Sequence, residues 1–252
     1  MTPRFACFVA CALLIAQRSD AGVATVFADN FLAGSKQVVT YPAGNPSSPT
    51  LVGPQADTFS GMDFDPNARL LWAIDFTAQS IGIVNQSDGS YLPTAMLENP
   101  TLCCSAFTID PRDGRFYGAR DANIYAIAKM TGQVSQVGSI SGTQITALAI
   151  DCSGRKLALA VDAMGNSALY EWAPGSTLVG ASSYSGPTSL EFDNQTGTLY
   201  AWFNATAQTS SNHVTINPAT GVESPLSSIE GRYRMAVRNT CPEHIFSDDH
   251  EA

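Results

Sequence analysis

Residues 107–125, FTIDPRDGRFYGARDANIY, predict one β-strand, a tight turn and a second strand that returns beside the first. Phe107 and Ile109 alternate with Thr108, as expected for a strand with two different faces. The segment Asp-Pro-Arg-Asp-Gly supplies the turn, because proline pre-sets φ for a type I turn and Gly114 accepts the left-handed conformation that follows. This strand–turn–strand unit organises the rest of the chain.

The same unit occurs four times along the sequence. Its turn aspartates, Asp65, Asp110, Asp151 and Asp193, are 45, 41 and 42 residues apart. After each strand pair a second pair follows around another turn, of which residues 87–89 (Ser-Asp-Gly) are one example. Each unit therefore predicts four short strands, and this strand count with a period of about 40–45 residues is typical of a β-propeller blade.

The two ends of the chain complete one further unit. Residues 24–53 contain the second, third and fourth strands of a blade, and residues 232–237 contain a first strand with nothing after it. Joining the ends removes two open strand edges. We therefore expect an all-β chain that forms a β-propeller, with five four-stranded blades closed by a C-terminal innermost strand. An open fragment of a larger propeller is the alternative.

Composition excludes some classes of partner. The chain has 252 residues, of which 44% are hydrophobic, and 13 Lys and Arg against 22 Asp and Glu give a net charge of −9. An acidic chain without a basic run is a poor partner for nucleic acid or an anionic membrane. We expect a monomer that binds neither.

The N-terminus resembles a secretory signal. Arg4 precedes an apolar run over residues 5–16, and Ser19-Asp20-Ala21 offers a cleavage site. The run is too short to span a bilayer, although an uncleaved anchor and a lipoprotein signal ending at Cys11 are alternatives. We expect a signal peptide over residues 1–21, a propeller over 22–240 and an acidic tail over 241–252. The mature protein would be secreted or periplasmic, with no membrane span.

Four cysteines remain after signal cleavage, namely Cys103, Cys104, Cys152 and Cys241. An even number in an oxidising compartment predicts disulfides, but the sequence leaves the connectivity open. Cys103 and Cys104 precede an innermost strand. They could form a vicinal disulfide or take part in ordinary structural bridges.

Catalytic motifs are absent from the sequence. There is no G-x-S-x-G segment, no H-E-x-x-H segment and no phosphate-binding glycine loop. Three histidines are too few for a metal centre that draws one ligand from each of several blades. We expect no catalytic residue and no cofactor, with Ca²⁺ held by carboxylates as the one candidate ion.

An acid or amide ends the second strand of every unit. We expect these five side chains to form an anionic collar on one face of the ring, and they are Asp29, Asp75, Asp121, Asp162 and Asn204. The collar could attract a cationic ligand or hold Ca²⁺ between blades. Alternatively, each side chain binds the backbone amides of its own turn. Phe76, Arg232 and Tyr233 lie at predicted loop or strand-start positions and are further candidates for contact with a ligand.

The turns DPRDG (residues 110–114) and NPATG (residues 217–221) resemble those of secreted propellers with YVTN-like and quinoprotein-amine-dehydrogenase-like repeats. The resemblance covers residues 24–237 and implies a fold rather than an activity. We expect an exported, non-catalytic scaffold that binds an extracytoplasmic protein or small molecule. The alternative is an enzyme, such as a lyase, hydrolase or quinone-dependent oxidoreductase, with its site at the top of the channel.

Overall fold

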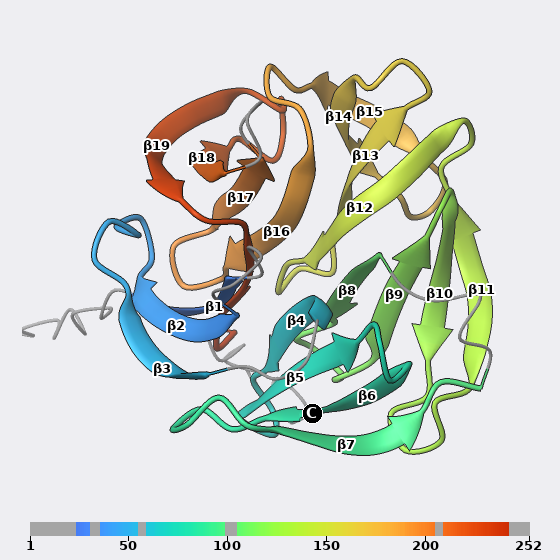
Figure 1. The fold of residues 1–252 in the computed structure, drawn as a ribbon. Helices are drawn as coiled ribbons and strands as arrows, with labels where there is room; N and C mark the ends of the chain where they lie inside the picture. The colour runs from blue at the N-terminus through green and yellow to red at the C-terminus, as the bar shows by residue number, and fades with distance from the viewer. Residues whose placement is uncertain (1–23, 31–35, 55–58, 99–104, 205–208, 242–252) are drawn as a thin grey trace, which may run out of the picture.

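The computed structural model describes residues 24–30, 36–54, 59–98, 105–204 and 209–241. These residues form five four-stranded antiparallel sheets arranged as the blades of a ring (Figure 1), which confirms the predicted propeller. Within the described ranges every regular element is a β-strand. No helix with the length and apolarity needed to cross a bilayer occurs in this part of the chain.

We number the blades 1 to 5 and give their strands from the channel outwards. Blade 1 consists of β20 (Tyr233–Val237), β1 (Thr25–Asn30), β2 (Gln37–Pro42) and β3 (Thr50–Pro54). Blade 2 consists of β4 (Phe59–Asp65), β5 (Leu70–Asp75), β6 (Ser80–Val84) and β7 (Tyr91–Met96). Blade 3 consists of β8 (Ala106–Ile109), β9 (Phe116–Arg120), β10 (Asn123–Ile127) and β11 (Val134–Ser139). Blade 4 consists of β12 (Thr143–Ile150), β13 (Lys156–Asp162), β14 (Ser167–Glu171) and β15 (Thr177–Ala181). Blade 5 consists of β16 (Pro187–Asp193), β17 (Thr198–Asn204), β18 (Ser210–Ile216) and β19 (Glu223–Glu230).

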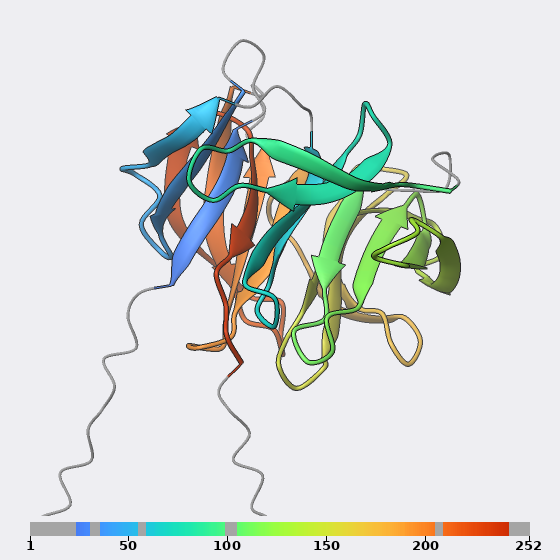
Figure 2. The ribbon, with the colours of Figure 1, turned by 90° about the horizontal axis from the view of Figure 1, so that it is seen from below.

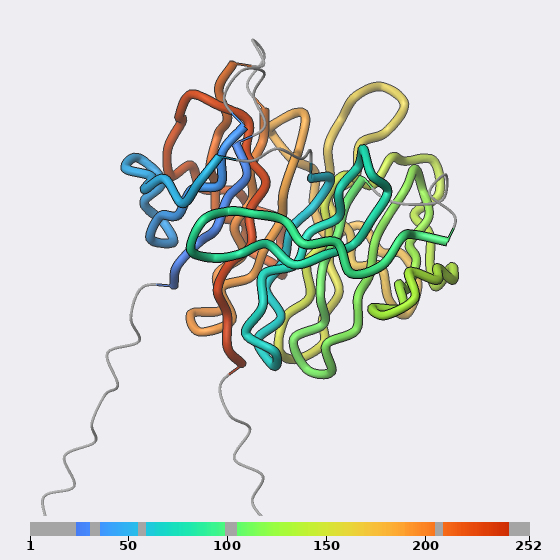
Figure 3. The backbone as a smooth tube through the Cα atoms, turned by 60° about the horizontal axis from the view of Figure 1, so that its bottom comes forward, coloured from blue at the N-terminus to red at the C-terminus, as the bar shows by residue number. Residues whose placement is uncertain are grey.

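The ring is closed by the C-terminal strand, as predicted. Strand β20 pairs antiparallel with β1, in a register that sets Val237 opposite Val26 and Tyr233 opposite Asn30. Figure 3 shows β1 and β20 side by side although they come from opposite ends of the chain. Strand β20 also contacts β4 and β16, so the five innermost strands surround the channel without a gap.

The hydrophobic core is divided into five clusters, each shared by two neighbouring blades. Between blades 2 and 3, Phe116 meets Trp72 and Phe107 edge to face, with ring centroids 5.0 and 5.4 Å apart. All three rings are buried, so aromatic residues pack blade against blade here. Burying one such side chain stabilises a fold by about 1.5–3 kcal/mol, so packing between blades dominates the stability of the ring.

The two faces of the ring are built differently. The turn face carries the hairpins between the first and second and between the third and fourth strands of each blade. Here Asp65 Oδ1 accepts hydrogen bonds from the amides of Asn67 and Ala68, at 3.0 and 3.1 Å. Gly114 has a φ of 70°, as the sequence predicted, and Gly197 at the matching turn of blade 5 has 71°. Strand β1 begins and β20 ends on this face (Figure 2). The opposite face, which we call the mouth face, carries the remaining connections.

A disulfide bond joins Cys152 to Cys241, with 5.5 Å between the Cα atoms. The chain after β20 crosses the base of blade 5 to reach blade 4, and Asn239 Oδ1 accepts a hydrogen bond from the Asn194 amide at 2.9 Å. Asn194 Oδ1 in turn accepts one from the Cys152 amide at 3.0 Å. Closure therefore includes a covalent link across the turn face. The expected signal peptide, Cys103, Cys104 and the tail beyond residue 241 lie outside the described residues.

Candidate functional site

The central channel is narrow. Its constricted part has a volume of about 10 Å³, which is room for about one water molecule. Small side chains of the innermost strands form most of its wall, and they are Ser60, Gly61, Ala106, Thr146, Ala147, Thr188 and Ser189. A ligand larger than water therefore has no room inside the channel and would have to bind at an end of it.

Hydrogen bonds between blades tie the innermost strands together at the mouth. Ser105 Oγ donates to the Ile145 carbonyl and Thr188 Oγ1 donates to the Tyr233 carbonyl, both at 2.7 Å. The Arg234 guanidinium donates in the same way to the Phe59 carbonyl of the next blade. Blade 1 therefore places an arginine where blades 3 and 5 use a hydroxyl group.

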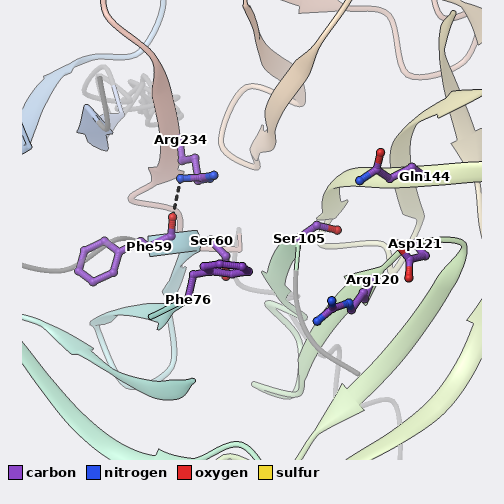
Figure 4. Close-up of a pocket in the computed structure, with 8 residues that line it drawn as sticks. All are labelled: Phe59, Ser60, Phe76, Ser105, Arg120, Asp121, Gln144 and Arg234. Atoms are coloured by element: carbon purple, nitrogen blue, oxygen red, sulfur yellow. Dashed lines mark hydrogen bonds between the residues drawn. The ribbon is translucent and has the colours of Figure 1, made fainter. Parts of the chain in front are cut away.

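A pocket of about 330 Å³ lies at the mouth, and we call it the mouth pocket. Its lining comes from blades 1 to 4 and consists of Phe59, Ser60, Phe76, Ser105, Arg120, Asp121, Gln144 and Arg234 (Figure 4). The volume is at the lower end of the range of about 300–1,000 Å³ for ligand pockets.

Phe76 offers an apolar surface to the mouth pocket. The side chain is 53% exposed and follows directly after β5. Its turn is braced, since Asp75 Oδ1 accepts hydrogen bonds from the amides of Thr77 and Ala78, at 2.7 and 3.1 Å. The Gln79 side chain also donates to the Phe76 carbonyl at 2.5 Å. An exposed ring on a braced turn is held in place for contact with another molecule.

Arg120 departs from the repeat. It ends β9, and strand pairing gives its counterpart in blade 2, because Gly118 lies opposite Phe107 as Ala73 lies opposite Met62. Two residues further along each strand, Arg120 stands where blade 2 has Asp75. In blade 3 the position instead places a guanidinium in the pocket lining. The next residue, Asp121, has a φ of 50°, which is uncommon for a residue other than glycine. Its carbonyl accepts a hydrogen bond from the Ile145 amide at 2.7 Å, which holds this conformation.

Arg234 is fixed by contacts on β20. Its guanidinium lies 3.8 Å from Asp29 Oδ2, and the two residues are directly opposite in the β1–β20 register. Burial lowers the pKa of Arg234 to about 10, with the Asp29 carboxylate acting against this. The side chain therefore remains charged at neutral pH, and it forms the wall between the mouth pocket and the channel.

The collar residues do not converge on one point. Of the five, Asp121 lines the mouth pocket, whereas Asp29 is fully buried beside Arg234. Asp75 and Asp162 accept hydrogen bonds from amides of their own turns, and the Asn166 side chain and amide hold the pKa of Asp162 below its usual value. Asn204 accepts a hydrogen bond from Arg232 Nε at 3.2 Å. Four of the five therefore have structural contacts instead of facing the pocket.

Two other candidates lie away from the pocket. Tyr233 is 5% exposed and packs on Trp202 with 5.1 Å between ring centroids, and its hydroxyl donates to the Glu230 carbonyl. Arg232 lies beside Asn204.

The sequence reasoning missed Arg120, Gln144 and Arg234. Comparing aligned positions across the repeats would have drawn attention to Arg120, because its counterpart in blade 2, Asp75, has the opposite charge.

Strongly perturbed acids lie deeper in the ring. Burial raises the pKa of Asp63 to about 7, although the amides of Ile109 and Phe64 and the Thr108 hydroxyl oppose the shift by donating hydrogen bonds. Burial, followed by the charge of Asp63, raises the pKa of Glu191 well above its usual value. Among the described residues, no group of three or more His, Cys, Asp or Glu side chains is arranged to hold a metal ion.

Comparison with known proteins supports the fold. No protein-family model matches the sequence, and no curated protein is similar to it in sequence. A chain from the crystal structure of a nidogen–laminin complex is 11% identical over 87% of this chain and 99% of its own length, with a TM-score of 0.55. The PQQ-bound aldose sugar dehydrogenase from Streptomyces coelicolor is 13% identical over 75% of this chain and 87% of its own, with a TM-score of 0.50. Since one neighbour comes from a protein complex and the other is an enzyme, the likeness shows a propeller fold that is found with both binding and catalysis.

Proposed function

We propose that the protein is an exported, non-catalytic binding propeller that takes a small ligand, or one side chain of a larger partner, in the mouth pocket. The observation that carries this proposal is the position of the pocket. It opens above a channel too narrow for any ligand larger than water, at the place where Arg234 of blade 1 and Arg120 of blade 3 both line the surface. In blade 2 the counterpart of Arg120 is Asp75, which binds the amides of its own turn, so the charge of this position is not fixed by the fold.

The chemistry of the lining favours binding over catalysis. The described lining contains no histidine or cysteine. These are the side chains that most often act as bases and nucleophiles near neutral pH, so the lining gives the enzyme alternative little support.

Export is part of the same proposal. A disulfide such as Cys152–Cys241 persists in oxidising compartments and is rare in reducing ones. Together with the signal-like N-terminus, this supports a secreted or periplasmic protein. N-terminal sequencing of the protein purified from culture medium or periplasm would test it, and we expect a start at or near Gly22.

Fragment screening by two-dimensional NMR on ¹⁵N-labelled protein tests the binding site. We expect amide shifts to gather at Phe76, Asp121 and Gln144, and to weaken in Phe76→Ala. The matched control is Met130→Ala, which removes another exposed apolar side chain (78% exposed) from the turn face. Fragments that cluster elsewhere, or turnover of a bound fragment, would contradict the proposal. A calcium titration in the same experiment tests the collar, since bound Ca²⁺ would shift the Asp75 and Asp121 amides.

A further inference from the structure

The mouth pocket has an unusual charge for this protein. The chain carries a net charge of −9, yet two guanidinium groups and one carboxylate line the pocket. Arg120 reaches it from the end of β9 and Arg234 from β20, so the two charges come from different blades and lie on different sides of the opening (Figure 4). The lining itself therefore carries one more positive than negative charge, with the buried Asp29 carboxylate 3.8 Å from Arg234.

Both arginines are partly exposed at the pocket. Arg234 donates to the Phe59 carbonyl, lies 3.8 Å from Asp29 and is only 20% exposed, so its guanidinium is positioned before a ligand arrives. Arg120 stands where blade 2 has Asp75 and is partly exposed. A guanidinium presents several N–H groups in one plane, which matches the two oxygens of a carboxylate.

The other lining residues limit the ligand further. Phe76, at the centre of Figure 4, presents an exposed ring that suits an apolar or aromatic group. Asp121 contributes one negative charge to the lining and would repel a second negative charge on a ligand. A group with one negative charge and an apolar body therefore fits better than a phosphate dianion.

We propose that the mouth pocket selects a monocarboxylate whose carboxyl group binds between Arg120 and Arg234 and whose apolar body lies on Phe76. This inference rests on the proposed binding function and adds the chemical class of the ligand. It predicts that the charge of the ligand, and not only its shape, decides binding.

Three probes of similar shape test the charge requirement on the wild-type protein by NMR titration. Phenylacetate carries a carboxylate, phenylacetamide is neutral and 2-phenylethylammonium is a cation. We expect phenylacetate to bind at the pocket at least about tenfold more tightly than phenylacetamide, because charge-assisted hydrogen bonds are lost in the amide. Its affinity should fall as salt is added, whereas that of the amide should not.

Variants then test whether Arg120 supplies the positive charge that binds the carboxylate. Arg120→Gln should reduce phenylacetate affinity to that of phenylacetamide, and Arg120→Lys should recover part of it. The control is Arg115→Gln, because Arg115 is 73% exposed on the turn face and pairs with Asp113. Should Arg120→Gln fail to fold, the wild-type comparison of the three probes and its salt dependence decides alone.

The outcomes separate the two proposals. Equal binding of phenylacetate and phenylacetamide at the pocket, or preference for the ammonium probe, would overturn the carboxylate inference and leave the binding function standing. If none of the three probes binds but other fragments of the screen do, the ligand class is wrong. If no fragment of any charge binds there, both proposals fall together.

Discussion

The turn face and the mouth face of this ring use the repeat in opposite ways. On the turn face, Asp65, Asp110 and Asp193 all accept a hydrogen bond from the amide two residues further along the chain. On the mouth face, corresponding positions differ, since blade 3 has Arg120 where blade 2 has Asp75. Arg234 makes with a guanidinium the kind of contact between blades that Ser105 and Thr188 make with a hydroxyl group. Repetition thus marks the residues that hold the ring together, and departure from it marks the candidate binding site.

This difference has a physical cause. The contacts that stabilise a hairpin turn are local, because the side chain and the amides it binds are close in sequence. The mouth pocket is not local, because its lining comes from four blades. Substitutions on the turn face and in the core between blades should therefore change stability, whereas substitutions at the mouth should change binding.

The largest loss of stability should follow removal of the closing strand. Ending the chain after Gly231 removes β20, exposes the edge of β1 and opens the ring, so we expect an aggregated or unfolded protein. Size-exclusion chromatography and circular dichroism would measure this. A chain ending after Cys241 keeps β20 and the disulfide and should fold cooperatively. A soluble monomer with a cooperative melt from the shorter chain would refute closure by β20.

Loss of the disulfide should cause the next largest loss of stability. Cys152 and Cys241 are 89 residues apart, and closing a loop of this length in the unfolded chain stabilises the fold by up to roughly 4–5 kcal/mol in the chain-entropy model. The double variant Cys152→Ser, Cys241→Ser should lose a large part of this in urea unfolding. Adding reductant to the wild type should have a similar effect. An unchanged free energy of unfolding in both experiments would show that the disulfide does not stabilise the ring.

A buried histidine should make the protein sensitive to acid. His213 is fully buried, stacks on Trp202 with ring centroids 4.4 Å apart, and burial lowers its pKa to about 4. Between pH 6.5 and 4 the unfolded chain binds a proton that the folded chain rejects, so stability is complete above pH 6.5 and falls as the pH decreases. The full loss is about 3 kcal/mol. His213→Phe should lose less stability than the wild type between pH 7 and pH 4, and parallel pH profiles would contradict the assignment.

Glu191 should have the opposite pH dependence. Because its pKa is raised by burial and by the charge of Asp63, the folded chain keeps a proton that the unfolded chain has lost. Its contribution to stability therefore decreases as the pH rises above the usual range of a glutamate. Glu191→Gln should be more stable than the wild type at pH 8 by about 1–3 kcal/mol and similar to it near pH 4. A difference that stays constant with pH would exclude ionisation as the cause.

The smallest change in stability should come from the mouth. Phe76 is 53% exposed, so Phe76→Ala should alter the unfolding free energy by less than about 0.5 kcal/mol while it reduces ligand binding. Phe116→Ala offers the contrast, because this ring is 1% exposed between blades 2 and 3 and its loss should cost about 3–5 kcal/mol. Similar losses for the two variants would erase the distinction between the mouth and the core.

Much of the fold could be predicted from the sequence. The period of the turn aspartates, with Gly114 and Gly197 at left-handed positions, defined the blades, and residues 232–237 were correctly expected to close the ring. The pairing of Cys152 with Cys241 was open, because both cysteines follow innermost strands but belong to different blades.

The candidate site was only partly predictable. Phe76 and Asp121 were among the candidate ligand contacts and line the mouth pocket, whereas Arg232 and Tyr233, also candidates, do not line it. Spacing alone placed one collar residue on each blade but could not say where its side chain points. Asp75 binds its own turn, whereas Asp121 lies one residue further along its blade, at the position of Phe76, and lines the pocket with it.

The sequence by itself determined the number of blades, the turns and the closing strand, because these depend on patterns that neighbouring residues carry. Only the tertiary structure decided that the channel is plugged and that Arg120 and Arg234 reach the same pocket. These two residues are far apart in the chain and come from blades 3 and 1. Their proximity depends on ring closure, which brings strands distant in sequence to one mouth, and no local pattern encodes that distance.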